Sequence, residues 1–116
     1  MSDVPSHEDV LALLADPYAR AILIATHGQP MTASTLADEL DAAPSTVYDR
    51  IDDLEAAGFL SETTRTDGRG NHYSEYRARL DRLNVRITED GIELAASYRD
   101  RDEAAERLHA LWSDLR

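Results

Sequence analysis

Residues 32–60 have the sequence TASTLADELDAAPSTVYDRIDDLEAAGFL, and this stretch decides the fold. Thr32 is a suitable N-cap for a helix, because its hydroxyl can accept a hydrogen bond from a backbone N–H of the first turn. The apolar residues that follow lie on one side of such a helix, and they are Leu36, Ala37 and Leu40. We therefore expect a short helix over about 32–40 that packs one face against a core.

A second helix is predicted over about 44–57, after a short turn at 41–43. Val47, Ile51 and Leu54 recur at spacings of four and three, so they form one stripe that faces inward. Gly58 suits the left-handed backbone position that follows many helices. The side chains near the start of the helix then point outward, and they are Ser45, Thr46, Tyr48, Asp49 and Arg50.

A β-hairpin is expected directly after this helix. Its first strand reaches about Thr66, and its return strand runs from about His72 to Leu80. The sequence DGRGN at 67–71 is a strong turn signal between the two strands. Two short helices, a tight turn and a glycine-tipped hairpin make a winged helix-turn-helix pattern, in which the second helix can enter a DNA major groove.

Two further helices are expected before this motif. Ser6 can cap the first of them. Asp16 and Pro17 can start the second, which ends near Gly28. Residues 21–24 at its centre are apolar nearly all round, which predicts a helix buried in the core.

The C-terminal part is predicted to hold a strand and then a long helix. Leu83, Val85 and Ile87 alternate with polar residues, which is typical of a strand with one buried face. The long helix is expected to begin at Thr88 or Asp90 and to continue to the last residue.

An apolar stripe in a heptad frame, broken only by Arg101, runs along this predicted last helix. Its residues are Leu94, Tyr98, Ala105, Leu108, Trp112 and Leu115. The stripe predicts a homodimer through a parallel or antiparallel helix pair; the alternative, that it packs on its own domain, stays open. The expected fold is mainly α with a small β-hairpin wing (α+β), with a winged helix-turn-helix DNA-binding domain at 1–88 and a long C-terminal dimerisation helix at 89–116.

The charge of the chain is unusual in sign and in distribution. The net charge is −11, from 23 acidic and 12 basic residues, and all of the basic residues are arginine. An acidic, lysine-free surface is typical of proteins from a high-salt cytoplasm, where molar salt shortens the Debye length to about 3 Å; an ordinary acidic protein is the alternative. Residues 63–88 nevertheless contain six arginines and three acidic residues. This basic segment indicates a polyanionic partner.

Several other classes of protein are not indicated. The sequence has no glycine-rich phosphate loop, no nucleophile motif and no cluster of metal ligands, so we expect no enzyme, no cofactor and no metal site. It contains no cysteine, which excludes disulfides. It has no apolar run that could span a membrane and no secretory signal, so we expect a cytoplasmic protein.

The stretch from Thr35 to Leu60, with PSTVY at 44–48 and LEAAGFL at 54–60, resembles the ArsR/PadR/MarR group of winged-helix regulators. Within that group the chain is most similar to the short haloarchaeal PadR-like regulators, and the resemblance covers roughly residues 7–90. It implies a homodimeric transcription regulator, more usually a repressor, with a role in stress response and a palindromic operator.

The resemblance also implies which residues contact double-stranded DNA. They are Ser45, Thr46, Tyr48 and Arg50 in the recognition helix, and Arg65, Arg69 and Asn71 in the wing. Asp49 lies among them and repels phosphate unless salt cations lie between the two, so we expect DNA affinity to depend weakly or inversely on salt. The alternative is a protein-interaction module of a transcription complex that does not bind DNA directly. The arginines of the wing favour DNA, because a wing that docks on a protein does not need them.

Overall fold

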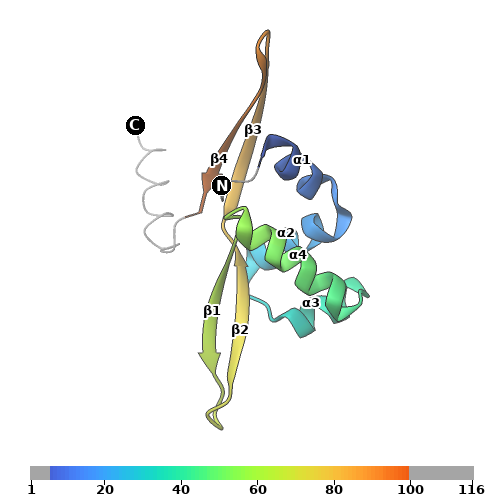
Figure 1. The fold of residues 1–116 in the computed structure, drawn as a ribbon. Coiled ribbons are helices and arrows are strands. Elements are labelled where there is room, and N and C mark those ends of the chain that lie inside the picture. The colour runs from blue at the N-terminus through green and yellow to red at the C-terminus, as the bar shows by residue number, and fades with distance from the viewer. Residues whose placement is uncertain (1–5, 100–116) are drawn as a thin grey trace, which may run out of the picture.

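The computed structural model describes residues 6–99, and these form four helices followed by four strands (Figure 1). The helices are α1 (His7–Ala15), α2 (Pro17–Gly28), α3 (Ala33–Leu40) and α4 (Pro44–Ala56). The strands are β1 (Leu60–Thr66), β2 (His72–Ala78), β3 (Leu80–Thr88) and β4 (Gly91–Tyr98). They pair as two antiparallel hairpins, β1–β2 and β3–β4, which extend in opposite directions from the helices (Figure 1).

The first three helices begin where the sequence predicts, because a side chain caps each of them. Ser6, Asp16 and Thr32 each accept a hydrogen bond from a backbone N–H in the first turn of α1, α2 and α3. Such caps satisfy backbone donors that have no partner within the helix. The fourth helix differs, since its N-cap is Ala43, which makes no side-chain capping bond.

The core forms around α2, which contacts α1, α3, α4 and β2. The largest fully buried apolar side chains of the core are Ile22, Leu36, Val47, Ile51 and Leu54. The last three of them are the predicted inward stripe of α4. The prediction that α2 lies in the core is confirmed by Ile22, which is fully buried, although Ile24 is exposed. One face of α2 therefore remains outside this core.

The β1–β2 hairpin is the wing predicted from the sequence. It pairs in register with Leu60 opposite Ala78, and its return strand ends there rather than near Leu80. Met31 ties the base of the wing to the helices, because its N–H donates to the Tyr76 carbonyl at 3.0 Å and its carbonyl accepts from the Tyr76 N–H at 2.7 Å. The wing therefore leaves the core at a fixed position.

Residues 91–98 form strand β4, so the prediction of a continuous helix from Thr88 or Asp90 to Arg116 is wrong over this segment. The apolar residues at 92, 94 and 96 alternate with the period of a strand. Gly91 has a φ of 142° and closes the turn that brings β4 back along β3. Glycine adopts this backbone conformation readily, whereas it weakens a helix.

The dimer positions predicted on that helix fall into two groups. Leu94 and Tyr98 lie on β4, so no helical heptad joins them to the other positions. The others, Ala105, Leu108, Trp112 and Leu115, lie outside the described residues.

Within the described part of the chain, no single helix is long and apolar enough to cross a membrane. Taken together, α1 and α2 pass that test by length and composition alone, and they are bent by 79° at the break between them.

Candidate nucleic-acid interface

The turn between α3 and α4 is tight, as a helix-turn-helix requires. Asp41 ends α3 in the left-handed conformation with a φ of 51°, and the Ala42 N–H donates to the Ala37 carbonyl at 3.0 Å. The buried stripe of α4 then fixes the rotation of that helix about its axis. Its opposite side faces solvent, where Ser45, Tyr48 and Asp49 are exposed and Thr46 and Arg50 are half-buried.

The start of α4 carries backbone donors that no side chain of the helix caps. Ala43 has no side-chain acceptor, Pro44 follows it, and the first turn holds no acidic residue. The N-terminus of a helix has a partial positive charge and exposed N–H groups, which suit a phosphate. Since α1, α2 and α3 all have side-chain caps, α4 is the helix among residues 6–99 whose start is open to an external anion.

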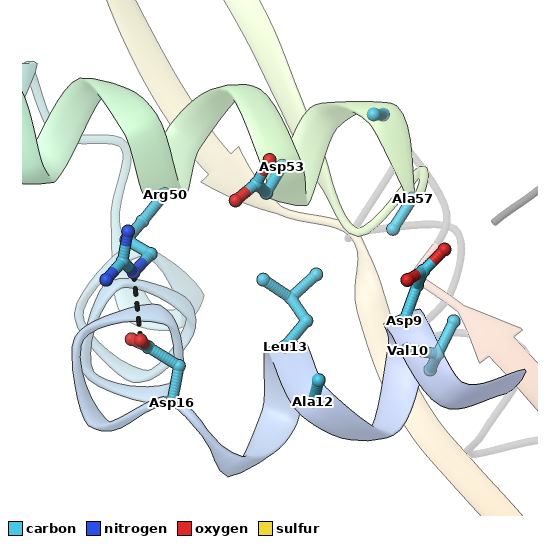
Figure 2. A pocket seen from close by; sticks show the side chains of 9 residues that line it. Asp9, Val10, Ala12, Leu13, Asp16, Arg50, Asp53 and Ala57 are labelled. Atoms are coloured by element: carbon cyan, nitrogen blue, oxygen red, sulfur yellow. Dashed lines mark hydrogen bonds and ion pairs between the residues drawn. The ribbon is translucent and has the colours of Figure 1, made fainter. Parts of the chain in front are cut away.

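Arg50, predicted to contact DNA, forms an ion pair with Asp16 at the corner between α1 and α2 (Figure 2). The Arg50 Nε lies 2.9 Å from the Asp16 Oδ2, and both side chains are half-buried. Asp16 also accepts from the Ala19 N–H at 2.9 Å, and this bond together with Arg50 holds the pKa of Asp16 below its ordinary value. The guanidinium of Arg50 therefore joins α4 to the N-terminal helices.

The later turns of α4 are acidic. Asp53 lines a cleft of about 480 Å³ between α1 and α4, together with Asp9 and the apolar side chain of Leu13 (Figure 2). Asp52 is exposed nearby. Burial raises the pKa of Glu55, and the charges of Glu62 and Asp52 raise it further. Beyond its first turns, α4 therefore presents a surface that repels phosphate.

The tip of the wing is a hydrogen-bonded loop that displays Arg69. The carboxylate of Asp67 accepts from the N–H groups of Arg69 at 2.8 Å and Asn71 at 3.0 Å, and these bonds lower the pKa of Asp67. The Asn71 side-chain amide also donates to Asp67 at 3.2 Å, so this predicted DNA contact takes part in holding the loop. Gly70 completes the turn with a φ of 85°. The exposed side chain of Arg69 therefore extends from a preorganised loop.

The charged residues that line a groove of about 360 Å³ along the wing are four arginines and two glutamates, namely Arg65, Arg77, Arg79, Arg99, Glu62 and Glu75. The Arg65 Nε pairs with the Glu75 Oε1 at 2.9 Å. The guanidinium of Arg99 donates to the His27 carbonyl at 2.6 Å. Arg65 and Arg77 lie on the hairpin face opposite to Tyr76, which is buried against the core. The groove therefore lies on the outer face of the wing.

Of these four arginines, only Arg65 was predicted from the sequence as a DNA contact. Arg77 and Arg79 belong to the basic segment 63–88, so the charge distribution contains a signal for them. Arg99 lies beyond that segment and comes near the wing only because β4 returns along β3. The groove adds a second positive surface, which the spacing of residues in the sequence does not predict.

Comparison with protein families shows a match between residues 14–63 and a family described as a helix-turn-helix domain. The matched segment runs from the end of α1 through α4 to the start of β1. A comparison with curated proteins finds no match to the chain. The family match supports a regulator that binds double-stranded DNA through a helix-turn-helix.

Proposed function

We propose that this chain is a sequence-specific transcription regulator that inserts the start of α4 into the major groove of DNA. The observation that carries the proposal is the exposed, uncapped start of α4, where Ser45 and Tyr48 face solvent. The N–H groups there can bind a phosphate, while Tyr48, which is 52% exposed, can reach a base edge. Arg69 at the wing tip suits the neighbouring minor groove or its phosphates.

The proposal extends to a homodimer that represses transcription by occupying a palindromic operator. Two copies related by a two-fold axis place two α4 helices about one DNA turn apart. The apolar sequence pattern at 105, 108, 112 and 115 supports association between copies. A role in stress response is supported by the resemblance to the haloarchaeal regulators. A high-salt cytoplasm is supported by the lysine-free composition with a net charge of −11, and no catalytic role is proposed.

The charges around α4 support an unusual salt dependence. Arginine–phosphate contacts release cations, so affinity ordinarily falls steeply with salt. Asp49 is exposed beside the open start of α4, and Arg50 is paired with Asp16. Cations held between Asp49 and DNA phosphates would offset the cations released by the wing arginines. We therefore expect DNA affinity to change little or to rise with KCl.

The first experiment is selection from random-sequence and genomic DNA pools over about 0.2–2 M KCl, which covers the range from ordinary to halophilic salt. Enrichment of a palindromic site supports the proposal. Tyr48→Ala should lose the sequence preference, whereas Tyr18→Ala should keep it, because Tyr18 is an exposed tyrosine on α2. Absence of DNA binding at every salt concentration contradicts the proposal and favours a protein-interaction module. A steep loss of DNA affinity with rising KCl contradicts only the argument that cations are held between Asp49 and the DNA phosphates.

A further inference from the structure

The β3–β4 hairpin has one apolar face. The strand register places three apolar pairs on it, with Leu83 opposite Ala96, Val85 opposite Leu94 and Ile87 opposite Ile92. At the base of the hairpin, Leu83, Leu94 and Ala96 pack against the core. Towards the tip the side chains become exposed, with Val85 at 50%, Ile92 at 43% and Ile87 at 72%. The described part of the molecule therefore covers this face only at its base.

A partner is needed for the outer half of this hairpin. An isolated two-stranded hairpin is marginally stable in water, and a contiguous exposed apolar face marks an interaction site. The hairpin extends past α1, away from the helices (Figure 1). We propose that a second copy of this chain covers the face, so that two β3–β4 hairpins pack against each other around a two-fold axis. This inference rests on the homodimer of the proposed function and specifies its interface.

The distribution of charge favours a second copy as the occupant. Two chains that each carry a net charge of −11 repel each other, so they need an uncharged surface on which to meet. All six residues of the apolar face are uncharged. The charged residues Arg82, Arg86 and Glu93 lie on the other face of the same hairpin, and Arg86 is directly opposite Glu93. Two identical apolar faces are complementary to each other around a two-fold axis.

The size of the interface points to a contribution from the chain beyond β4. A standard interface buries about 800 Å² on each partner, which is more than three exposed side chains supply. The hairpin ends at Tyr98, and the apolar sequence positions 105, 108, 112 and 115 follow it in the chain. The apolar pattern in that part of the sequence supplies further apolar residues for an interface of standard size.

The test is the dimer dissociation constant of the full chain, measured by sedimentation equilibrium in high KCl. Ile87→Asp places a carboxylate on the apolar face, and Asn84→Asp adds the same charge to an exposed position on the other face of β3. Because two-fold symmetry places each substitution in the dimer twice, Ile87→Asp should raise the dissociation constant at least about 100-fold. Asn84→Asp should change it less than about threefold. Ile92→Asp on β4 repeats the test from the partner strand.

The possible results separate this inference from the proposed function. A wild-type chain that stays monomeric at every concentration overturns both the hairpin interface and the homodimer. A wild-type dimer that Ile87→Asp and Ile92→Asp leave intact overturns only the hairpin interface. The fluorescence emission of Trp112, which is the single tryptophan of the chain, distinguishes a third possible result. If its emission is blue-shifted in the dilute monomer and Ile87→Asp removes the shift, the chain's own C-terminal segment covers the face, and the proposal is wrong.

Discussion

The start of α4 allows a test in which folding stability and DNA affinity change in opposite directions. Ala43, its N-cap, is exposed and has a φ of −64° and a ψ of 141°, the extended conformation that N-cap residues adopt. Ala43→Asp therefore introduces a capping carboxylate without a change of backbone. The same interaction already exists at α2, where the Asp16 carboxylate accepts from the Ala19 N–H at 2.9 Å.

The expected gain in stability follows from the cap and from the charge. Replacing alanine by aspartate at an N-cap stabilises a helix by about 1 kcal/mol, and a negative charge beside the helix N-terminus adds about 0.3–1 kcal/mol. The free energy of unfolding should therefore rise by about 1–2 kcal/mol. In a domain of this size each kcal/mol raises the unfolding midpoint by about 4–8 °C, which thermal unfolding resolves easily. Ala43→Ser is the matched control, because serine supplies the cap without the charge.

DNA affinity should fall in the same variant. If a phosphate binds the start of α4, the new carboxylate both occupies the N–H groups and repels the phosphate. A hydrogen bond to a charged group contributes about 1.5–3 kcal/mol, so its loss lowers affinity about tenfold or more. Ala43→Ser should lower affinity less, since its hydroxyl competes for the donors without adding charge. Both variants are compared with wild type by DNA titration at one salt concentration.

Two results would refute this reasoning. If Ala43→Asp leaves the unfolding midpoint unchanged, the first-turn donors of α4 are not open in the folded protein. If both variants gain stability and keep the DNA affinity of wild type, no phosphate binds at this helix N-terminus. The second result would leave the wing as the source of any DNA binding.

Three further predictions follow from single contacts. Asp16→Asn keeps the cap of α2 but loses the ion pair with Arg50, so the free energy of unfolding should fall by about 0.5–1 kcal/mol. Because the pKa of Asp16 is lowered in the folded state, its charge stabilises the fold above the ordinary aspartate pKa, and this stabilisation is lost as pH falls through the lowered value. Unfolding measured from about pH 7 downwards should therefore show a stability difference between wild type and Asp16→Asn that shrinks as the carboxylate becomes protonated in acid, and a difference that is independent of pH would contradict the assignment. Arg69→Ala should weaken DNA binding and release about one cation fewer on binding, which moves the slope of affinity against KCl in the positive direction, while Arg86→Ala on β3 should do neither; equal losses of affinity would contradict a DNA contact by Arg69. Ile51→Ala should lower the free energy of unfolding by about 2–5 kcal/mol, because Ile51 is fully buried, and a loss below about 1 kcal/mol in denaturant unfolding would contradict that burial.

Local patterns in the sequence were sufficient to predict the helix-turn-helix. The caps at Ser6, Asp16 and Thr32 act on N–H groups only a few residues away, so the sequence contains both partners of each interaction. The stripe of Val47, Ile51 and Leu54 has the period of a helix, and all three side chains are buried. Elements that are defined by neighbours in the sequence are predictable from it.

Elements that depend on distant partners were not predictable in this way. The four-residue spacing of Leu94 and Tyr98 fits a heptad, yet β4 forms because Gly91 permits a turn and β3 supplies hydrogen-bond partners. The outward position of Arg50 on α4 was inferred from helical spacing alone. Its ion-pair partner, Asp16, lies 34 residues earlier, and nothing in the spacing of α4 indicates that contact.

These contacts give α4 and the wing different roles in the proposed DNA complex. The one arginine of α4 is paired with Asp16, and the exposed Asp49 and Asp52 make the rest of its surface acidic. In the proposed complex the helix would therefore attract DNA only through the N–H groups at its start, and electrostatic attraction would come mainly from the wing arginines. Contacts to phosphates position a protein on DNA, whereas contacts to base edges select the sequence. Substitutions at Tyr48 should accordingly change which site is bound, whereas substitutions at Arg69 should change how tightly every site is bound.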